Sequence, residues 1–306
     1  MTIAMTVFNG RVLRVSAAVL LSVSALAGAA CSALPTGPDE TGDGGSGAGT
    51  QIHYTAVGAS DAIAIGASVE CLPFIECPAG TGYVQIISRR LAEGGKTVSL
   101  LNLGIPGAVL SPRIQTISQS YGPRVDFNFL ERELPFVSRD STVVTIFAGG
   151  NDSNVVARSV SGASNGNPRA YVDDQVRQFA SEMAVLVDGI RNRAPSARIV
   201  IANLPNFAGA PFTNNYTLDQ RRALQQISVG FSKEGVNPLA SRPNVAVVDL
   251  LCEERFYQPS TYSQDGFHPS DSGYAIMADL MLSAIRSTSY PAPSASCGRM
   301  SLVPAL

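Results

Sequence analysis

Hydrophobic residues along the chain gather in short runs that alternate with longer amphipathic segments. Five runs rich in β-branched residues occupy 53–58, 97–103, 142–147, 197–203 and 244–251, and each has the length of a buried strand. Between them, apolar residues recur at steps of three and four, which predicts helices over 82–91, 171–193, 218–231 and 272–285. The clearest helix face, in 171–193, would carry Val172, Val176, Phe179, Met183, Leu186 and Ile190.

Strands that alternate with helices imply βαβ units around a parallel sheet. The strand runs are almost continuously hydrophobic, which is typical of strands covered by helices on both faces. We therefore predict an α/β fold, a three-layer α/β/α sandwich with a five-stranded parallel sheet. In such folds the ligand site lies beyond the carboxyl ends of the strands. Residues that directly follow each run are therefore the candidates for function.

The first 30 residues have the layout of a secretory signal peptide, with Arg11 and Arg14 before an apolar stretch over 15–27 and a few small residues. That stretch is shorter than the roughly 20 residues that a membrane-spanning helix needs. Cys31 follows directly, and this arrangement resembles the lipobox of bacterial lipoproteins, although Gly28 stands where the lipobox usually has Leu. We expect export to the cell envelope with a lipid anchor at Cys31. Ordinary cleavage and secretion of a soluble protein is the alternative.

Residues 31–50 are rich in Gly, Pro and acidic residues and predict a flexible linker. As a Gly-rich coil it would span roughly 25 Å on average. The remaining residues, 51–306, contain no internal repeat and fit one domain.

Five cysteines in an exported chain leave one unpaired. If Cys31 carries the lipid, an even number remains, and an oxidising compartment makes disulfides the default. Cys71 with Cys77 would close a short loop, and Cys252 with Cys297 would tie the C-terminal tail to the body. Sequence alone permits other pairings. A zinc site is disfavoured because Cys-x5-Cys is not a usual zinc spacing.

The charge balance and the loops exclude several classes of partner. The formal net charge is −2, with no run of Lys or Arg, so nucleic acid is not an expected partner. None of the strand-end loops has the clustered Gly and Ser/Thr that cradle a phosphate. We expect a monomer without cofactor or metal, whose only membrane contact is the lipid at Cys31.

The chain has only two histidines, so the choice of an imidazole base is narrow. His53 opens the first strand run and is best explained as a strand-end or surface residue. His268 lies in Asp265-Gly266-Phe267-His268-Pro269, between the fifth run and the last helix. Three-residue spacing lets the Asp265 carboxylate reach the imidazole and fix its tautomer, and Pro269 suits the first turn of a helix. The competing interpretation has Asp265 at a helix start and His268 on the surface.

Three further strand-end residues could complete a site. Ser60, in Gly58-Ala59-Ser60-Asp61, follows the first run and would expose its hydroxyl. Gly107 follows the second run, where a glycine lets a backbone N–H approach a substrate closely. Asn151, in Gly149-Gly150-Asn151-Asp152, follows the third and could stabilise an oxyanion with a neutral amide. Each alone could be an ordinary turn, whereas together they make a stronger signal.

The set Ser60, Gly107, Asn151 and His268 resembles the four signature residues of the SGNH hydrolases, which include the GDSL esterases and lipases. The similarity covers 54–286. It implies a flavodoxin-like fold and hydrolysis of carboxylic esters, with Ser60 as nucleophile, His268 as base and Asp265 as its orienting partner. It also implies an oxyanion hole made by the N–H groups of Ser60 and Gly107 and the amide of Asn151.

One residue departs from the family pattern, because Ala59 stands where the Gly-Asp-Ser motif has aspartate. Ala59 cannot make the hydrogen bonds of that carboxylate, and Asp61 is the candidate to substitute for it. The departure should affect how the turn is held more than whether the chemistry exists.

Substrate choice should depend on the loops over the site, expected at 153–170, 204–217 and 252–264. The last contains Phe256, Tyr257 and Tyr262, which could pack on an acyl chain or a sugar, or equally could cap the core. We expect short acyl esters, including acetylated glycans, as substrates. Two alternatives are acyl transfer to a sugar hydroxyl and a non-catalytic surface lipoprotein that binds acylated or glycan ligands.

Overall fold

The computed structural model describes residues 51–122 and 124–306. Its sheet contains β1 (Gln51–Gly58), β2 (Thr97–Asn102), β3 (Val143–Phe147), β4 (Arg198–Ala202) and β5 (Val245–Val248). The strand order is β2-β1-β3-β4-β5, and every pairing is parallel. The predicted α/β fold with a five-stranded parallel sheet is therefore confirmed. The predicted signal peptide, linker and Cys31 lie outside the described residues.

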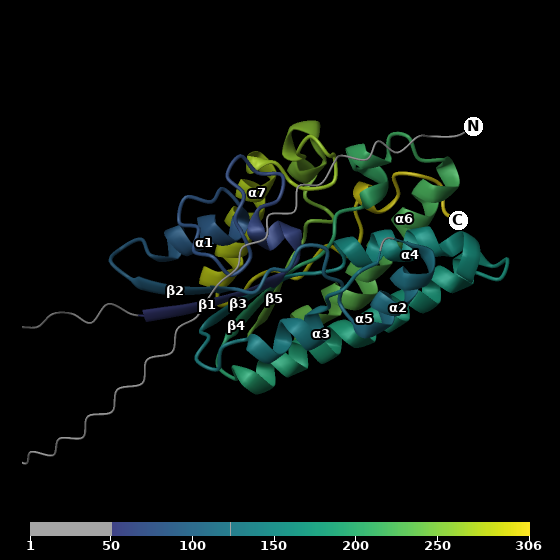
Figure 1. Cartoon of the computed structure of the whole chain (residues 1–306). Helices are drawn as coiled ribbons and strands as arrows, with labels where there is room; N and C mark the ends of the chain where they lie inside the picture. Colours follow the sequence, from purple (N-terminus) through teal and green to yellow (C-terminus); the bar gives the residue numbers. More distant parts are fainter. Residues whose placement is uncertain (1–50, 123) are drawn as a thin grey trace, which may run out of the picture. The chain divides into compact units, whose positions relative to one another are not determined.

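Helices cover both faces of the sheet. Figure 1 shows α1 (Tyr83–Leu91) and α7 (Asp271–Arg286) on one face, with α3 (Phe129–Arg132) and α5 (Pro168–Arg193) on the other. Three further helices, α2 (Pro112–Tyr121), α4 (Gly150–Ala163) and α6 (Leu218–Gly230), extend the second layer. Of these, α4 contacts both α2 and α6, and α4 and α6 both contact α5. In the described part of the chain no helix combines the length and apolarity that crossing a membrane requires.

The longest helix follows directly from its sequence. Asn167 caps the N-terminus of α5 by accepting a hydrogen bond from the N–H of Ala170, and Pro168 occupies its first turn. All six apolar residues of the predicted face are buried. Helix α6 begins with a capping box between Thr217 and Gln220. Local capping thus begins both helices, and the apolar face of α5 is buried in the core.

Several local expectations were wrong. The predicted loop over 153–170 is mostly helix, since α4 runs to Ala163. Strand β2 is not covered on both faces, because it lies at the edge of the sheet and most of its residues are exposed. Pro269 is not in the first turn of α7: Ser270 caps this helix, and Pro269 pairs with Tyr262 in an isolated bridge.

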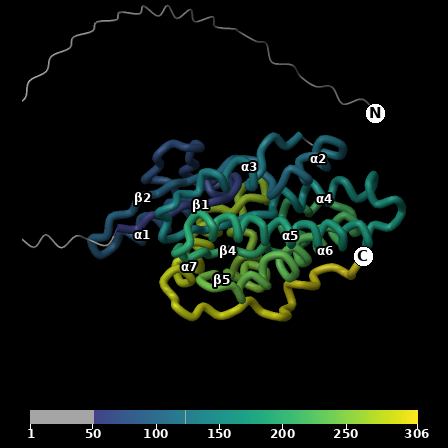
Figure 2. Tube along the Cα trace, turned by 90° about the horizontal axis from the view of Figure 1, so that it is seen from below, coloured from purple at the N-terminus to yellow at the C-terminus, as the bar shows by residue number. Residues whose placement is uncertain are grey.

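Both expected disulfides are formed, one between Cys71 and Cys77 and one between Cys252 and Cys297. The second holds the C-terminal tail, which Figure 2 shows in yellow running from α7 past β5 to α6. At its far end Gln225 of α6 accepts hydrogen bonds from the N–H groups of Leu302 and Val303. The tail is thus fastened at both ends to the body of the domain.

Candidate active site

Ser60, His268 and Asp265 form one line of hydrogen bonds at the carboxyl edge of the sheet. Ser60 follows β1 in a short 3₁₀ turn (Ser60–Ile63), and His268 lies in the segment between β5 and α7. The His268 Nε2 lies 2.9 Å from Ser60 Oγ, and the His268 Nδ1 lies 2.5 Å from Asp265 Oδ2. Residues 208 positions apart therefore meet as the sequence predicts. The interpretation of His268 as an unrelated surface residue is wrong.

The Asp265 carboxylate is held by several donors. Its Oδ1 accepts from the N–H groups of Phe267 and His268 and from the Ser263 hydroxyl. Burial raises the pKa of Asp265, but the hydrogen bonds from the His268 ring, the two N–H groups and Ser263 outweigh it and bring the pKa to about 2. Asp265 is therefore ionised at neutral pH, and its carboxylate accepts the hydrogen bond from the His268 ring.

Gly266 permits this tight segment. Its φ is +71°, and a Cβ there would lie 2.7 Å from the backbone nitrogen of Phe212. The N–H of Phe212 donates to the Gly266 carbonyl at 3.2 Å. A side chain at this position would separate the two segments, so a glycine is required.

Gly107 and Asn151, the other two residues of the set, line one cavity. Gly107 has φ +76° in the loop after β2, and Asn151 lies in the first turn of α4. The Asn151 side chain donates to the Ala108 carbonyl at 2.9 Å, which leaves its second N–H for a ligand. The loop that carries Gly107 also contacts the end of β1 next to Ser60, because the Ile105 N–H donates to the Gly58 carbonyl.

The turn that carries Ser60 is held by a residue that the sequence did not single out. Glu133 is fully buried, and its Oε2 accepts a hydrogen bond from the Gly58 N–H at 2.9 Å. Burial raises the pKa of Glu133 well above its usual value, and the bond from Gly58 lowers it only in part. Asp61, the expected substitute for the missing aspartate, makes no side-chain hydrogen bond to another residue in the described ranges. No sequence signal marked Glu133, because it follows the short α3 without a recognisable motif.

A second buried carboxyl lies next to Asn151. Asp152 Oδ1 accepts from the Leu110 N–H at 2.9 Å, while its Oδ2 has no partner in the described part of the chain. Burial raises the pKa of Asp152 to about 7, against the opposing effect of the bond from Leu110. This group ties the start of α4 to the loop after Gly107.

The aromatic residues beside the site are not those that the sequence suggested. Phe256 and Tyr262 are buried in the core, and the Tyr257 hydroxyl is occupied by hydrogen bonds with Asn206 and Leu251. Capping the core is therefore their role. Instead, the half-buried Phe267 packs edge-on against His268 with ring centres 5.0 Å apart, and Phe212 packs edge-on against Phe267 at 5.2 Å.

The other candidate groups lie elsewhere. His53 is near the start of β1, at the far end of the strand from Ser60, with its Nδ1 3.2 Å from Asp140 Oδ2. Its interpretation as a structural residue at the strand end agrees with this position. No group of three or more His, Cys, Asp or Glu side chains within 51–122 and 124–306 could hold a metal ion.

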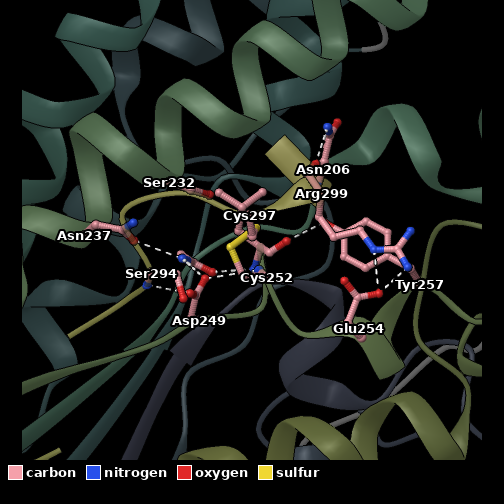
Figure 3. The surroundings of a disulfide bond; sticks show 12 residues. Asn206, Ser232, Asn237, Asp249, Cys252, Glu254, Tyr257, Ser294, Cys297 and Arg299 are labelled. Atoms are coloured by element: carbon pink, nitrogen blue, oxygen red, sulfur yellow. Dashed lines mark hydrogen bonds and ion pairs between the residues drawn. A yellow bond between two sulfur atoms is a disulfide. The ribbon is translucent and has the colours of Figure 1, made fainter. Parts of the chain in front are cut away.

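Figure 3 shows the Cys252–Cys297 disulfide, which joins the segment after β5 to the C-terminal tail. Asp249 Oδ1 accepts from the Asn203 amide and from the Cys252 N–H, and its Oδ2 accepts from the Ser294 N–H of the tail. Asn206 donates to the Arg299 carbonyl at 2.8 Å. The tail therefore supports the segment that leads to Phe212.

Comparisons with known proteins identify the family and the fold. A family model for the GDSL-like lipase/acylhydrolase family matches residues 61–276. A lipase from a goat rumen metagenome superimposes with a TM-score of 0.53 and 20% identity, covering 76% of this chain and 97% of that one. A phospholipase A1 from Streptomyces albidoflavus gives a TM-score of 0.50 and 17% identity, covering 78% and 99%.

No match was found among curated proteins. The two structural likenesses, at this level of identity, concern the fold. The family model, in contrast, spans well over half of the chain. The chain belongs to the GDSL-like lipase/acylhydrolase family, a family of carboxylic ester hydrolases.

Proposed function

We propose that the chain cleaves carboxylic esters through an acyl-enzyme on Ser60. The observation that carries the proposal is the continuous line Ser60–His268–Asp265, with spacings of 2.9 Å and 2.5 Å. Ser60 Oγ attacks the ester carbonyl while its proton passes to His268 Nε2. The C–O bond to the alcohol then breaks, and the alcohol leaves with that proton.

Water completes the cycle by the same route. His268 takes a proton from the water as it attacks the acyl-enzyme, and returns it to Ser60 Oγ as the acid departs. Asp265 remains ionised and keeps Nδ1 of His268 protonated. The Ser60 and Gly107 N–H groups and the free N–H of Asn151 would bind the oxyanion of both tetrahedral intermediates.

We further propose short acyl esters, including acetyl esters of glycans, as the substrate class. Support comes from the lining of the cavity at Gly107 and Asn151, in which polar and charged side chains outnumber the apolar ones. A series of p-nitrophenyl esters of increasing acyl length tests this. We expect kcat/KM to be greatest for short chains, and an optimum at long chains would refute the assignment.

A fluorophosphonate probe tests the nucleophile directly. It should label the wild type covalently, the Ser60→Ala variant should remain unlabelled, and the surface control Ser241→Ala should label like the wild type. Removing one oxyanion donor, as in Asn151→Ala, should lower kcat about 100-fold or more. A folded wild type that resists the probe would contradict the proposal.

The expected export and lipid anchor at Cys31 remain a proposal on residues outside the described ranges. The Cys31→Ser variant of the full-length chain, expressed in a bacterial host, should lose incorporation of labelled fatty acid and move from the membrane fraction to the soluble fraction. Fatty-acid labelling that survives the substitution would exclude this anchor.

A further inference from the structure

A cavity of about 370 Å³ extends from the proposed oxyanion hole to a pair of arginines. It is lined at one end by Gly107 and Asn151 and elsewhere by Arg124 and Arg158. The proposed mechanism uses only the end at Gly107 and Asn151. The remainder of the cavity is therefore available for a part of the substrate other than the ester group.

Helix α4 sets the length of this cavity. Asn151, Asn154, Val155 and Arg158 line it, and their spacing of three, four and seven residues places them on one helix face. A rise of about 1.5 Å per residue separates the backbone of Arg158 from that of Asn151 by about 10 Å. Helical side chains lean toward the N-terminus, so the guanidinium can reach back toward the ester.

The far end of the cavity is positively charged. Arg124 is paired with Asp126, whose Oδ1 lies 2.6 Å from Arg124 Nε. Arg158 is exposed and makes no ion pair or side-chain hydrogen bond with the described residues. The charged residues of the lining are thus two arginines and one aspartate, so the lining has a net positive charge although the formal net charge of the whole chain is −2. A guanidinium with five donors that are not used by any of the described residues is suited to a carboxylate or a phosphate.

The rest of the lining is mainly apolar. Val125 and Val155 belong to it, together with Phe127, which is 44% exposed. A substrate that fills this space would carry a short apolar segment between its ester and a charged end.

We propose that this enzyme prefers esters that carry an anionic group, a carboxylate or a phosphate, which Arg158 binds with assistance from Arg124. The inference rests on the proposed function, because it places the scissile carbonyl at Gly107 and Asn151. Arg158 is a specificity-determining residue that acts on substrate binding.

Matched substrates test the preference. The p-nitrophenyl ester of hexanoic acid is compared with the hydrogen adipate, which has the same chain length and a terminal carboxylate. The hydrogen suberate extends the chain, and a hexanoate with a terminal phosphate separates phosphate from carboxylate recognition. We expect kcat/KM to be about three- to tenfold higher for an anionic ester than for its neutral partner, through a lower KM. Added salt should reduce this ratio.

Variants locate the effect. Arg158→Gln should bring the anionic-to-neutral ratio of kcat/KM close to one, and Arg158→Glu should invert it and favour the p-nitrophenyl ester of aminohexanoic acid. Arg177→Gln is the matched control, because Arg177 is an exposed arginine on α5 that pairs with Asp174 outside the cavity. It should leave both activities unchanged.

The outcomes separate the two proposals. Equal hydrolysis of anionic and neutral esters by the wild type would overturn this inference and leave the proposed function intact. A preference that Arg158→Gln does not change would also overturn it. Absence of both hydrolysis and fluorophosphonate labelling would instead overturn the proposed function.

Discussion

At the residue scale, the turn at Ser60 is held without the aspartate of the Gly-Asp-Ser motif. Ala59 is 6% exposed, so its methyl group occupies a buried position. The turn is held from outside the motif, because Glu133 accepts the Gly58 N–H. This bond joins residues 75 positions apart, and no pattern in the sequence predicts it. Family resemblance singled out Ser60, whereas the hydrogen bond between Gly58 and Glu133 that holds its turn is visible only in the structure.

Substitutions at Glu133 should separate positioning from simple packing. Glu133→Gln keeps an acceptor for the Gly58 N–H without a charge, and should retain most of the rate of fluorophosphonate labelling. Glu133→Leu leaves that N–H unsatisfied, which costs about 1–3 kcal/mol, and should slow labelling of the folded enzyme severalfold. Urea unfolding and labelling rates are measured on both variants. Equal labelling by the leucine variant would indicate that Glu133 only packs.

The buried carboxyl of Asp152 should make stability depend on pH. Its pKa is raised from 3.8 to about 7 in the folded protein, so its contribution to stability is complete below pH 4 and is lost as the pH rises through 7. The Asp152→Asn variant has no titratable group at this position, so it does not lose this stability as the pH rises. Relative to the wild type, its free energy of unfolding should increase between pH 4 and pH 8 by on the order of 3 kcal/mol.

Urea unfolding at the two pH values measures this difference. Asp219→Asn is the surface control, because its side chain is 82% exposed. If the free energies of unfolding of the wild type and of Asp152→Asn differ by the same amount at both pH values, Asp152 does not titrate in this range.

At the element scale, hydrophobic periodicity predicted the five strands and the helices α1, α5, α6 and α7 because each presents a continuous run or one clear apolar face. It failed for α4, whose sequence is rich in Gly, Asn and Ser, residues that disfavour helix interiors. Packing against α2, α5 and α6 stabilises α4 instead. The failure matters because this helix carries Asn151 and Arg158.

The start of α4 depends on Gly149. Its φ is +107°, and a Cβ there would lie 3.0 Å from Leu204 Cδ1 and from Phe179 Cζ. Gly149→Ala should therefore destabilise the protein by about 2–4 kcal/mol through backbone strain and overpacking, and should lower kcat by displacing Asn151. Thermal unfolding and p-nitrophenyl ester hydrolysis measure the two effects.

Gly94 supplies a control for strain alone. Its φ is +77°, but a Cβ there would meet nothing within 4 Å. Gly94→Ala should cost about 1–2 kcal/mol without a change in kcat. If Gly149→Ala and Gly94→Ala behave alike, the packing around Gly149 does not position Asn151.

At the scale of the whole molecule, the C-terminal tail joins parts of the domain that the sheet does not connect. Cys297 bonds to Cys252 after β5, Arg299 forms an ion pair with Glu254, and Gln225 of α6 binds Leu302 and Val303. The cysteine count suggested this closure, but the hydrogen bonds of the tail have no sequence signature. The tail therefore stabilises the loops that lead to Phe212 and Gly266.

The two disulfides should differ in what they contribute. Cys252 and Cys297 are 45 positions apart, whereas Cys71 and Cys77 are 6 apart. If cross-linking acts on the entropy of the unfolded chain, removing the first pair costs about 4 kcal/mol and removing the second about 2 kcal/mol. The paired serine variants, Cys252→Ser with Cys297→Ser and Cys71→Ser with Cys77→Ser, test this order by urea unfolding.

Activity should separate the two bonds further. Without the Cys252–Cys297 bond the tail supports Asn206 less firmly, and the Phe212 N–H then holds the Gly266 carbonyl less firmly beside His268. We expect ester hydrolysis by this variant to fail at a lower temperature than its global unfolding, whereas the Cys71/Cys77 variant should lose activity and fold together. Parallel loss of activity and fold in both variants would show that the tail stabilises the domain without acting on the position of His268.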